Sequence, residues 1–468
     1  MERFVFSKLE MWLVMLLLII ALALGGIWAF SVIKYHVFPY RQISDLRAAI
    51  KGVPGDDRPL LTRLAGGLVF IPRAFPAQQK ATVLEVDQLS SVQAAETAQG
   101  PLPVLDNMRF AYFGDTKRYF VVYGSFVFPE LEENTGSILI DTDGMVHRAW
   151  PASVEGSEFL GMHIGLALGE DGRVATNSKG ILTAESWCGG KLWQAPYNPP
   201  ADGIRREHDA MDGYDWHHDI TYYNGDFYTF VGPDIGIVDA LTGEIRQLIG
   251  GLDMMRWAWR DGLSIMDTRN NIFIPDLLTP ETAAELMAPD PFHFNKVDVV
   301  TAELAPEYPM FREGDLLVSL RELNLLVVVR PDEERIVWWR YGLTSRQHDA
   351  TLIDGAIEVF NNAPFTSPPK PTIRRVFVDR VGFEDIFDLS QWKMIMRQKG
   401  NFERRGDRLL TVDDNAGRVI AGKLSGDIEF DFENGYAAPG EEPENLQLRS
   451  AVEIAEQNFI RFQAQCDG

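Results

Sequence analysis

The segment His348-Asp-Ala-Thr-Leu-Ile-Asp-Gly355, with the apolar run at residues 357–360 that follows it, decides the fold. Its Asp-Gly pair is a tight hairpin turn signal placed directly before a strand. The same order of a histidine, six to eight residues, a glycine and a strand begins at His163 and at His218. His293 fits the pattern with a longer insertion before its glycine. A unit of about four strands that recurs roughly every 50 residues is typical of β-propeller blades.

The chain around this repeat has the same character. Short strand-like runs separated by turn residues follow one another at a spacing of about 8–12 residues, which indicates an all-β protein. We expect a β-propeller of about six blades between residues 108 and 435. The innermost strand of each blade in such a fold lines a central channel. If each repeat histidine begins that strand, the four imidazoles converge at one mouth of the channel.

Composition and charge narrow the function classes. The chain of 468 residues holds 28 Phe, 13 Tyr and 11 Trp, a load that suits half-buried strands. Its formal net charge is -23, from 67 acidic and 44 basic residues. Nucleic-acid binding is not expected, because it depends on neutralising phosphates with Lys and Arg. An anionic substrate would need a local cluster of His or Arg to overcome this field.

The N-terminal region predicts a membrane anchor. Residues 11–33 contain no charged side chain, and as a helix they would reach about 34 Å, enough to cross a bilayer core. A cleavable signal peptide is the alternative, but its apolar run is usually only about 7–15 residues long. We therefore expect a single transmembrane helix at residues 11–33, preceded by a cytoplasmic N-terminus at residues 1–10.

The remaining boundaries follow from changes in composition. Turn-rich and polar residues predict a stalk or linker at 34–107, before the propeller at 108–435. Residues 436–468 predict an acidic C-terminal tail with a helix. The two cysteines, Cys188 and Cys466, are too far apart in sequence for a zinc or redox motif. A disulfide that ties the tail to the body and two unrelated thiols are equally compatible with this spacing.

Five segments resemble the bacterial arylsulfotransferase family. The most specific is the run of residues 347–362, which ends in Phe-Asn-Asn where the family more often has Phe-Asp-Asn. The others are Trp216-His-His-Asp-Ile220, His293-Phe-Asn295 with Ser319-Leu-Arg321, residues 138–150, and residues 417–430. The resemblance spans about residues 108–435.

This resemblance implies sulfuryl transfer from a phenolic sulfate ester to a phenolic acceptor, without a nucleotide donor, a cofactor or a metal. His348 would be the nucleophile and would form a sulfohistidine, while His218, His293 and Arg321 would surround the sulfuryl oxygens. Secondary candidates for the site are His163, His217 and Asn295. The resemblance also implies that the bulk of the chain is periplasmic, held at the bacterial inner membrane by its single span.

An alternative reading is a catalytically inactive propeller that serves as a scaffold or accessory subunit of a membrane protein complex. The anchor, the stalk and the acidic tail motivate it, because propellers often act as interaction platforms and a fold does not fix a function. A quinone-dependent dehydrogenase is a weaker alternative, since neither a repeated Trp docking motif nor a calcium-site signature is evident in the sequence.

Overall fold

The computed structural model describes residues 89–466, with gaps at 130–134, 153–161, 179, 196–215, 264–291, 365–369, 395, 397–398, 439 and 441. The predicted N-terminus at 1–10, the predicted span at 11–33 and the stalk up to residue 88 lie outside the described residues. Among the helices that are described, none is long and apolar enough to cross a membrane.

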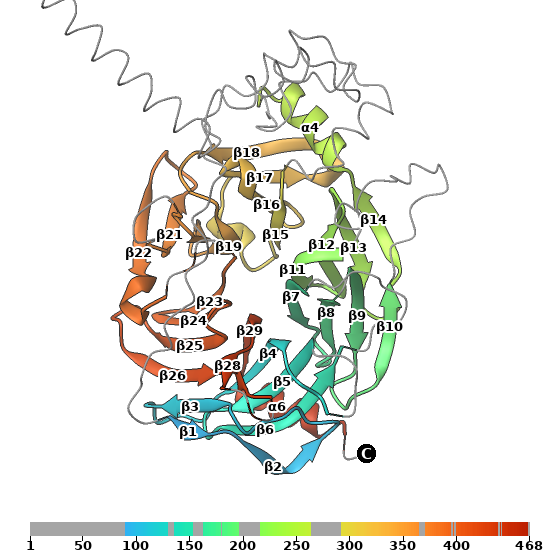
Figure 1. Cartoon of the computed structure of the whole chain (residues 1–468). Coiled ribbons are helices and arrows are strands. Elements are labelled where there is room, and N and C mark those ends of the chain that lie inside the picture. The colour runs from blue at the N-terminus through green and yellow to red at the C-terminus, as the bar shows by residue number, and fades with distance from the viewer. Residues whose placement is uncertain are drawn as a thin grey trace, which may run out of the picture. The chain divides into compact units, whose positions relative to one another are not determined.

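The described strands form a six-bladed β-propeller, as expected from the sequence (Figure 1). Blades two to five are antiparallel sheets of four strands, each built from consecutive strands. Blade two is β7 (Met162–Leu168), β8 (Val174–Ser178), β9 (Ile181–Glu185) and β10 (Lys191–Ala195). Blade three is β11 (Trp216–Tyr223), β12 (Asp226–Val231), β13 (Asp234–Asp239) and β14 (Ile245–Ile249). Blade four is β15 (Phe294–Val299), β16 (Leu316–Leu320), β17 (Leu325–Arg330) and β18 (Arg335–Tyr341). Blade five is β19 (His348–Ile353), β20 (Ala356–Asn361), β21 (Thr372–Phe377) and β22 (Phe383–Asp388).

Both ends of the propeller chain close the ring. Blade one contains β4 (Tyr119–Ser125), β5 (Thr135–Asp141), β6 (Met145–Pro151) and β2 (Gln93–Gln99), and its innermost strand is the C-terminal β29 (Leu448–Ile454). Blade six contains β23 (Asn401–Arg405), β24 (Arg408–Asp413), β25 (Arg418–Lys423) and β26 (Ile428–Glu433), extended by the N-terminal β3 (Arg109–Tyr112) and β1 (Ser90–Ser91). The propeller therefore runs from Ser90 to Ile454, beyond the sequence-based bounds of 108 and 435 on both sides.

Short elements complete the described chain. Two α-helices lie outside the blades, α4 (Gly251–Arg260) and α6 (Glu456–Gln463). Single turns of 3₁₀ helix are η2 (Ala305–Glu307), η3 (Arg321–Leu323), η4 (Pro331–Glu333) and η5 (Leu389–Trp392). A small ribbon pairs β27 (Gly435–Tyr436) with β28 (Glu444–Asn445). The helix α6 lies within the stretch where the sequence predicted one.

Apolar packing between the blades forms the core. Each blade has neighbours on both faces, so a middle strand such as β17 is a continuous apolar run rather than an alternating one. Phe230 of blade three stacks on Phe294 of blade four with ring centroids 5.4 Å apart. Burial of each large apolar side chain contributes about 1.5–3 kcal/mol, and this holds one blade against the next.

Tryptophans link neighbouring blades through their indole N–H groups. Their acceptors are backbone carbonyls 34 to 47 residues further along the chain, in four pairs: Trp150 with Ser186, Trp193 with Ala240, Trp338 with Val378, and Trp392 with Gly426. A buried indole N–H needs such a partner. These tryptophans are therefore structural, and they form a repeated inter-blade contact that the sequence analysis did not recognise.

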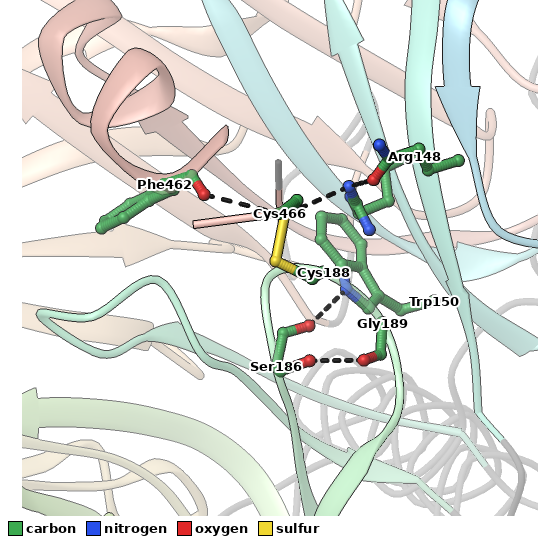
Figure 2. Close-up of a disulfide and its surroundings, with 8 residues drawn as sticks. Arg148, Trp150, Ser186, Cys188, Gly189, Phe462 and Cys466 are labelled. Atoms are coloured by element: carbon green, nitrogen blue, oxygen red, sulfur yellow. Dashed lines mark hydrogen bonds between the residues drawn. A yellow bond between two sulfur atoms is a disulfide. The ribbon is translucent and has the colours of Figure 1, made fainter. Parts of the chain in front are cut away.

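A disulfide between Cys188 and Cys466 joins the C-terminal end of the chain to blade two (Figure 2). Cys188 lies in the turn between β9 and β10, and Cys466 follows α6. Trp187 packs on Phe462 of α6 with ring centroids 5.1 Å apart. Of the two alternatives left open by the sequence, the structure has the disulfide. It fastens the segment that follows β29, the strand that closes the ring.

Candidate functional site

The repeat histidines lie at the start of innermost strands. His348 is the first residue of β19, His217 and His218 are the second and third of β11, and His293 directly precedes β15. The backbone of His163 is the second residue of β7, and its side chain lies outside the described residues. The six innermost strands together line a cavity of about 470 Å³. The histidines thus belong to one end of the central channel.

A β-bulge accompanies each of these histidines. The register of the innermost strand shifts between Met162 and Leu166, between His217 and Thr221, between Phe294 and Lys296, and between His348 and Thr351. Such a bulge re-aims a side chain and is typical of sites where a strand carries function. Three residues at these positions have left-handed backbones: His218 at φ 61°, His293 at φ 50° and Asp349 at φ 46°. Each costs about 1–3 kcal/mol that the surrounding packing must offset.

Three imidazoles form a hydrogen-bonded chain. The Nε2 atom of His217 lies 2.6 Å from the carbonyl oxygen of Gly232, which can only accept, so His217 donates from Nε2. When His217 is neutral, its Nδ1 must accept from Nδ1 of His218. The Nε2 atoms of His218 and His293 lie 3.0 Å apart and share one proton. With all three imidazoles neutral, these contacts make His218 the donor to His217 and His293 the donor to His218.

His348 is held in one tautomer. The amide nitrogen of Asn362 donates to the carbonyl of Lys399, which turns its Oδ1 toward His348. That oxygen lies 2.7 Å from Nδ1 of His348, so Nδ1 carries the hydrogen and donates it. The opposite nitrogen, Nε2, therefore has a lone pair, and it has no hydrogen-bond partner among the described residues. The site presents a neutral imidazole with one nitrogen ready to attack an electrophile.

Burial and nearby positive charge keep His348 neutral. Its side chain is 1% exposed. Burial lowers the pKa of His348 well below its ordinary 6.5, and the charge of Arg321 lowers it further, against the hydrogen bond to Asn362 that raises it. At neutral pH the imidazole is therefore the unprotonated form that a nucleophile requires.

A cluster that contains two arginines acts electrostatically on His348. Arg321 begins η3 and lies 2.8 Å from the Glu322 carboxylate, to which Arg346 also donates through both terminal nitrogens. Burial alone would raise the pKa of Glu322, but Arg321 and Arg346 hold it at about 2, so the carboxylate is charged. Within this trio two guanidinium groups face one carboxylate. Arginines so placed are the kind of group that an anionic substrate needs on so acidic a chain.

Two polar residues join blade four to the start of β19. The side-chain nitrogen of Asn295 donates to the carbonyl of Gln347 over 2.7 Å, directly before His348. The side chain of Gln347 donates back to Ser319 Oγ and to the carbonyls of Leu320 and Leu325. Both side chains are buried. Asn295, a secondary candidate from the sequence, therefore holds the backbone directly before His348.

The structure joins His217, His218 and His293 in one chain of hydrogen bonds. It also brings His348 close enough to Arg321 for the positive charge to lower its pKa. Sequence reasoning did not single out Asn362, Glu322 or Arg346. Asn362 stood inside the Phe-Asn-Asn run already noticed, two residues beyond the strand partner of His348, which was a usable signal. Glu322 and Arg346 are ordinary charged residues in the sequence, and only the fold places them together.

The comparisons with known proteins agree with part of the sequence analysis. Residues 251–435 match the family model described as arylsulfotransferase (ASST). This segment includes His293, Arg321 and His348, and its match supports the resemblance to that family. No curated protein matches the chain.

Several solved structures are similar to the chain at low sequence identity. A protein of unknown function from Bacteroides caccae matches with a TM-score of 0.43 and 11% identity, over 73% of this chain and 100% of its own. A 6-phosphogluconolactonase, described as putative, from Bacteroides fragilis matches with a TM-score of 0.38 and 10% identity, over 73% and 99%. BamB from Moraxella catarrhalis matches with a TM-score of 0.31 and 12% identity, over 77% and 92%. Likenesses this distant carry no argument about function.

Proposed function

We propose that this protein transfers a sulfuryl group from a phenolic sulfate ester to a phenolic acceptor through a sulfohistidine at His348. The observation that carries the proposal is the state of His348. Its Nδ1 hydrogen is held by Asn362, its Nε2 lone pair has no hydrogen-bond partner among the described residues, and Arg321 acts on it electrostatically. The family match over residues 251–435 supports sulfuryl transfer in general.

In the first step the Nε2 lone pair attacks the sulfur of the donor. An N–S bond forms and the S–O bond to the aryl group breaks, so the electron pair leaves on the phenolate. Splitting one difficult transfer into two steps suits an imidazole nucleophile. The ring becomes a sulfo-imidazolium, and Asn362 Oδ1 stabilises its positive charge by accepting the retained Nδ1 hydrogen.

The proton shared by His218 and His293 serves the leaving phenolate. The pair does this in its protonated form: an imidazolium donates the proton to the phenolate and returns to a neutral imidazole, and the pair recovers a proton from the acceptor phenol in the second step. The acceptor oxygen then attacks sulfur, the N–S bond breaks, and its electrons return to Nε2 of His348. Arg321 suits the equatorial sulfuryl oxygens because its planar guanidinium matches a tetrahedral oxyanion.

The cellular setting is part of the proposal. The disulfide between Cys188 and Cys466 supports an oxidising compartment such as the bacterial periplasm. The uncharged residues 11–33 would anchor the chain to the inner membrane. We expect the whole chain to stay in the membrane fraction after alkaline carbonate washing, and a variant without residues 1–33 to be released. Release of the whole chain would contradict the anchor.

Turnover tests the proposed reaction. We expect purified protein to release 4-nitrophenol from 4-nitrophenyl sulfate when a phenol acceptor is present, and His348→Ala to abolish the release. His147→Ala is the matched control, because His147 pairs with Asp141 in blade one, away from this site. Absence of phenol release from the wild-type chain with any aryl sulfate and acceptor would contradict the proposal and favour the scaffold alternative.

A further inference from the structure

A buried lysine connects the bulges that carry the histidines. Lys296 lies on β15, three residues after His293, with a side chain that is 12% exposed. Its ammonium donates to Asp219 Oδ2 over 2.5 Å and lies 3.2 Å from Asp349 Oδ1. Asp219 directly follows His218, and Asp349 directly follows His348. One ammonium group therefore links blades three, four and five at the positions of the site.

The contact extends into blade six. The second carboxylate oxygen of Asp349 accepts hydrogen bonds from the Phe402 backbone over 2.6 Å and from the Asn401 side chain over 3.1 Å. On β15, Asp298 accepts the backbone N–H of Leu352 over 2.8 Å. Four neighbouring blades are thus cross-connected beneath the histidines by one lysine and two aspartates, Lys296, Asp219 and Asp349, which we call the clamp.

The clamp lysine is charged although it is buried. Burial by itself would lower the pKa of Lys296, but the charges of Asp219, Asp349 and Asp298 raise it above its ordinary value. Burial raises the pKa of Asp219 to about 6, against the opposing effect of Lys296. A buried ion pair adds little to stability compared with apolar packing of the same volume, so its presence calls for another reason.

The bulges supply that reason. His218 and Asp349 have left-handed backbones that a strand does not hold by itself. A bulged strand has lost a ladder hydrogen bond where it bulges. Lys296 contacts Asp219 and Asp349, the residues next to His218 and His348. These ionic contacts can hold each bulge where the hydrogen bonds of the sheet are missing.

We propose that Lys296 is a positioning residue, whose ammonium holds the bulges of β11 and β19 so that His218 and His348 meet one sulfuryl group. This inference rests on the proposed function and extends it to a residue that does not touch substrate. The expected loss is large, because a misplacement of about 1 Å in a reacting group can reduce a rate on the order of 10²-fold.

The test compares variants that differ in charge balance. Lys296→Met alone leaves two buried carboxylates without a cationic partner and can fail to fold for that reason. The triple variant Asp219→Asn/Lys296→Met/Asp349→Asn removes all three charges together and is the informative one. Lys117→Met is the matched control, because Lys117 also bridges two aspartates, Asp141 and Asp143, but in blade one.

Two readouts are measured on the full chain, at a temperature where circular dichroism shows each variant folded. For the triple variant we expect kcat to fall about 100-fold. We expect its calorimetric affinity for 4-nitrobenzenesulfonate, which cannot transfer its sulfonate, to fall only about tenfold, because Arg321 still binds the anion. Lys117→Met should change neither quantity. A triple variant that keeps both kcat and affinity within about twofold of wild type would overturn the inference.

The affinity readout separates this inference from the proposed function. If the wild-type chain binds the sulfonate but never turns over an aryl sulfate, the proposed function fails, and the change in affinity still tests the clamp. If turnover is present and the triple variant keeps both its turnover and its affinity, the clamp inference fails alone.

Discussion

At the scale of single residues, the proposed chemistry depends on which nitrogen of His348 carries the hydrogen. Asn362 decides this, because its own N–H group is committed to the Lys399 carbonyl and its oxygen is left to accept. Removal of a side chain that orients a functional imidazole typically lowers activity by about 10–100-fold.

Replacement of Asn362 by leucine tests that role. The change keeps the size of the side chain and removes its acceptor, so the tautomer of His348 is no longer fixed. We expect kcat to fall about 10–100-fold with little change in the KM for the donor. Steady-state kinetics with 4-nitrophenyl sulfate provide the measurement, and an unchanged kcat would show that Asn362 does not orient the imidazole.

The pH dependence of kcat/KM reports the protonation of His348. Burial and Arg321 lower its pKa well below 6.5 in the folded protein, so the imidazole stays neutral as the pH falls through 6.5. The acidic limb of kcat/KM should therefore lie well below pH 6.5. Asn362→Asp places a negative charge at Nδ1, which favours the imidazolium and should move the limb to higher pH. A limb that stays in place in this variant would contradict the assignment to His348.

The sequence was informative about residues that carry a motif and silent about those that support them. His348, His218, His293 and Arg321 could be named because each stands at a repeated or family-like position. Lys296 belongs to no such motif. Its partners, Asp219 and Asp349, follow histidines on other blades, and contacts between blades cannot be read from one segment of sequence.

At the scale of secondary-structure elements, a glycine and an asparagine of blade two support His218. Gly165 lies in the bulge of β7, and its backbone N–H donates to Asn177 Oδ1 over 2.9 Å. The side-chain nitrogen of Asn177 donates in turn to the carbonyl of His218. A Cβ atom at Gly165 would lie 2.5 Å from that carbonyl oxygen and 2.5 Å from the Asn177 amide atoms.

Gly165→Ala should therefore disturb His218 more than the fold. The added methyl group displaces the His218 backbone or breaks its contact with Asn177, and we expect kcat to fall about tenfold or more. Overpacking of this kind typically destabilises a protein by about 1–3 kcal/mol. Chemical denaturation and kinetics on the same samples separate the two effects. Full activity in a folded variant would show that the β7 bulge does not position His218.

Strand existence was predictable at this scale, but strand partnership was not. Apolar runs with turn residues between them indicated strands, as at residues 357–360 within β20. The bulges were not visible, because an extra residue in a strand leaves the local composition unchanged. The closing strand β29 was predicted to be part of an acidic tail, because only its pairing with the distant β4 reveals it. Arg118, directly before β4, donates to Glu453 of β29 across 335 residues of sequence.

At the scale of the whole molecule, the ring depends on how its ends are fastened. β29 completes blade one and borders blades two and six, and the disulfide between Cys188 and Cys466 secures the segment that follows it. The cross-link spans 278 residues of sequence, so it restricts the unfolded chain strongly in the chain-entropy account.

Removal of the disulfide should lower stability without changing the site. For Cys188→Ser/Cys466→Ser we expect a loss of about 2–5 kcal/mol in the free energy of unfolding and a Tm lower by several degrees. A reductant should have the same effect on the wild-type chain and none on the double variant. Calorimetry with and without reductant gives the comparison, and equal Tm values under all conditions would show that the ends are held by packing alone.

The fold class and the approximate number of blades could be predicted because the same sequence unit recurs along the chain. The charged cluster that acts on His348 could be anticipated only in general terms, because a chain this acidic needs local positive charge to bind an anion. Its residues, Arg321, Arg346 and Glu322, come from η3 and the approach to β19, and only the folded ring brings these segments together.

The most direct test of the central claim is the mass of the peptide that contains His348. After brief incubation with 4-nitrophenyl sulfate without acceptor, tandem mass spectrometry under alkaline conditions should find an addition of about 80 Da, one sulfuryl group, on His348. The addition should disappear when a phenol is supplied, and it should be absent from His348→Ala. A protein that releases phenol while His348 stays unmodified, or that carries the group on another residue, would contradict the account.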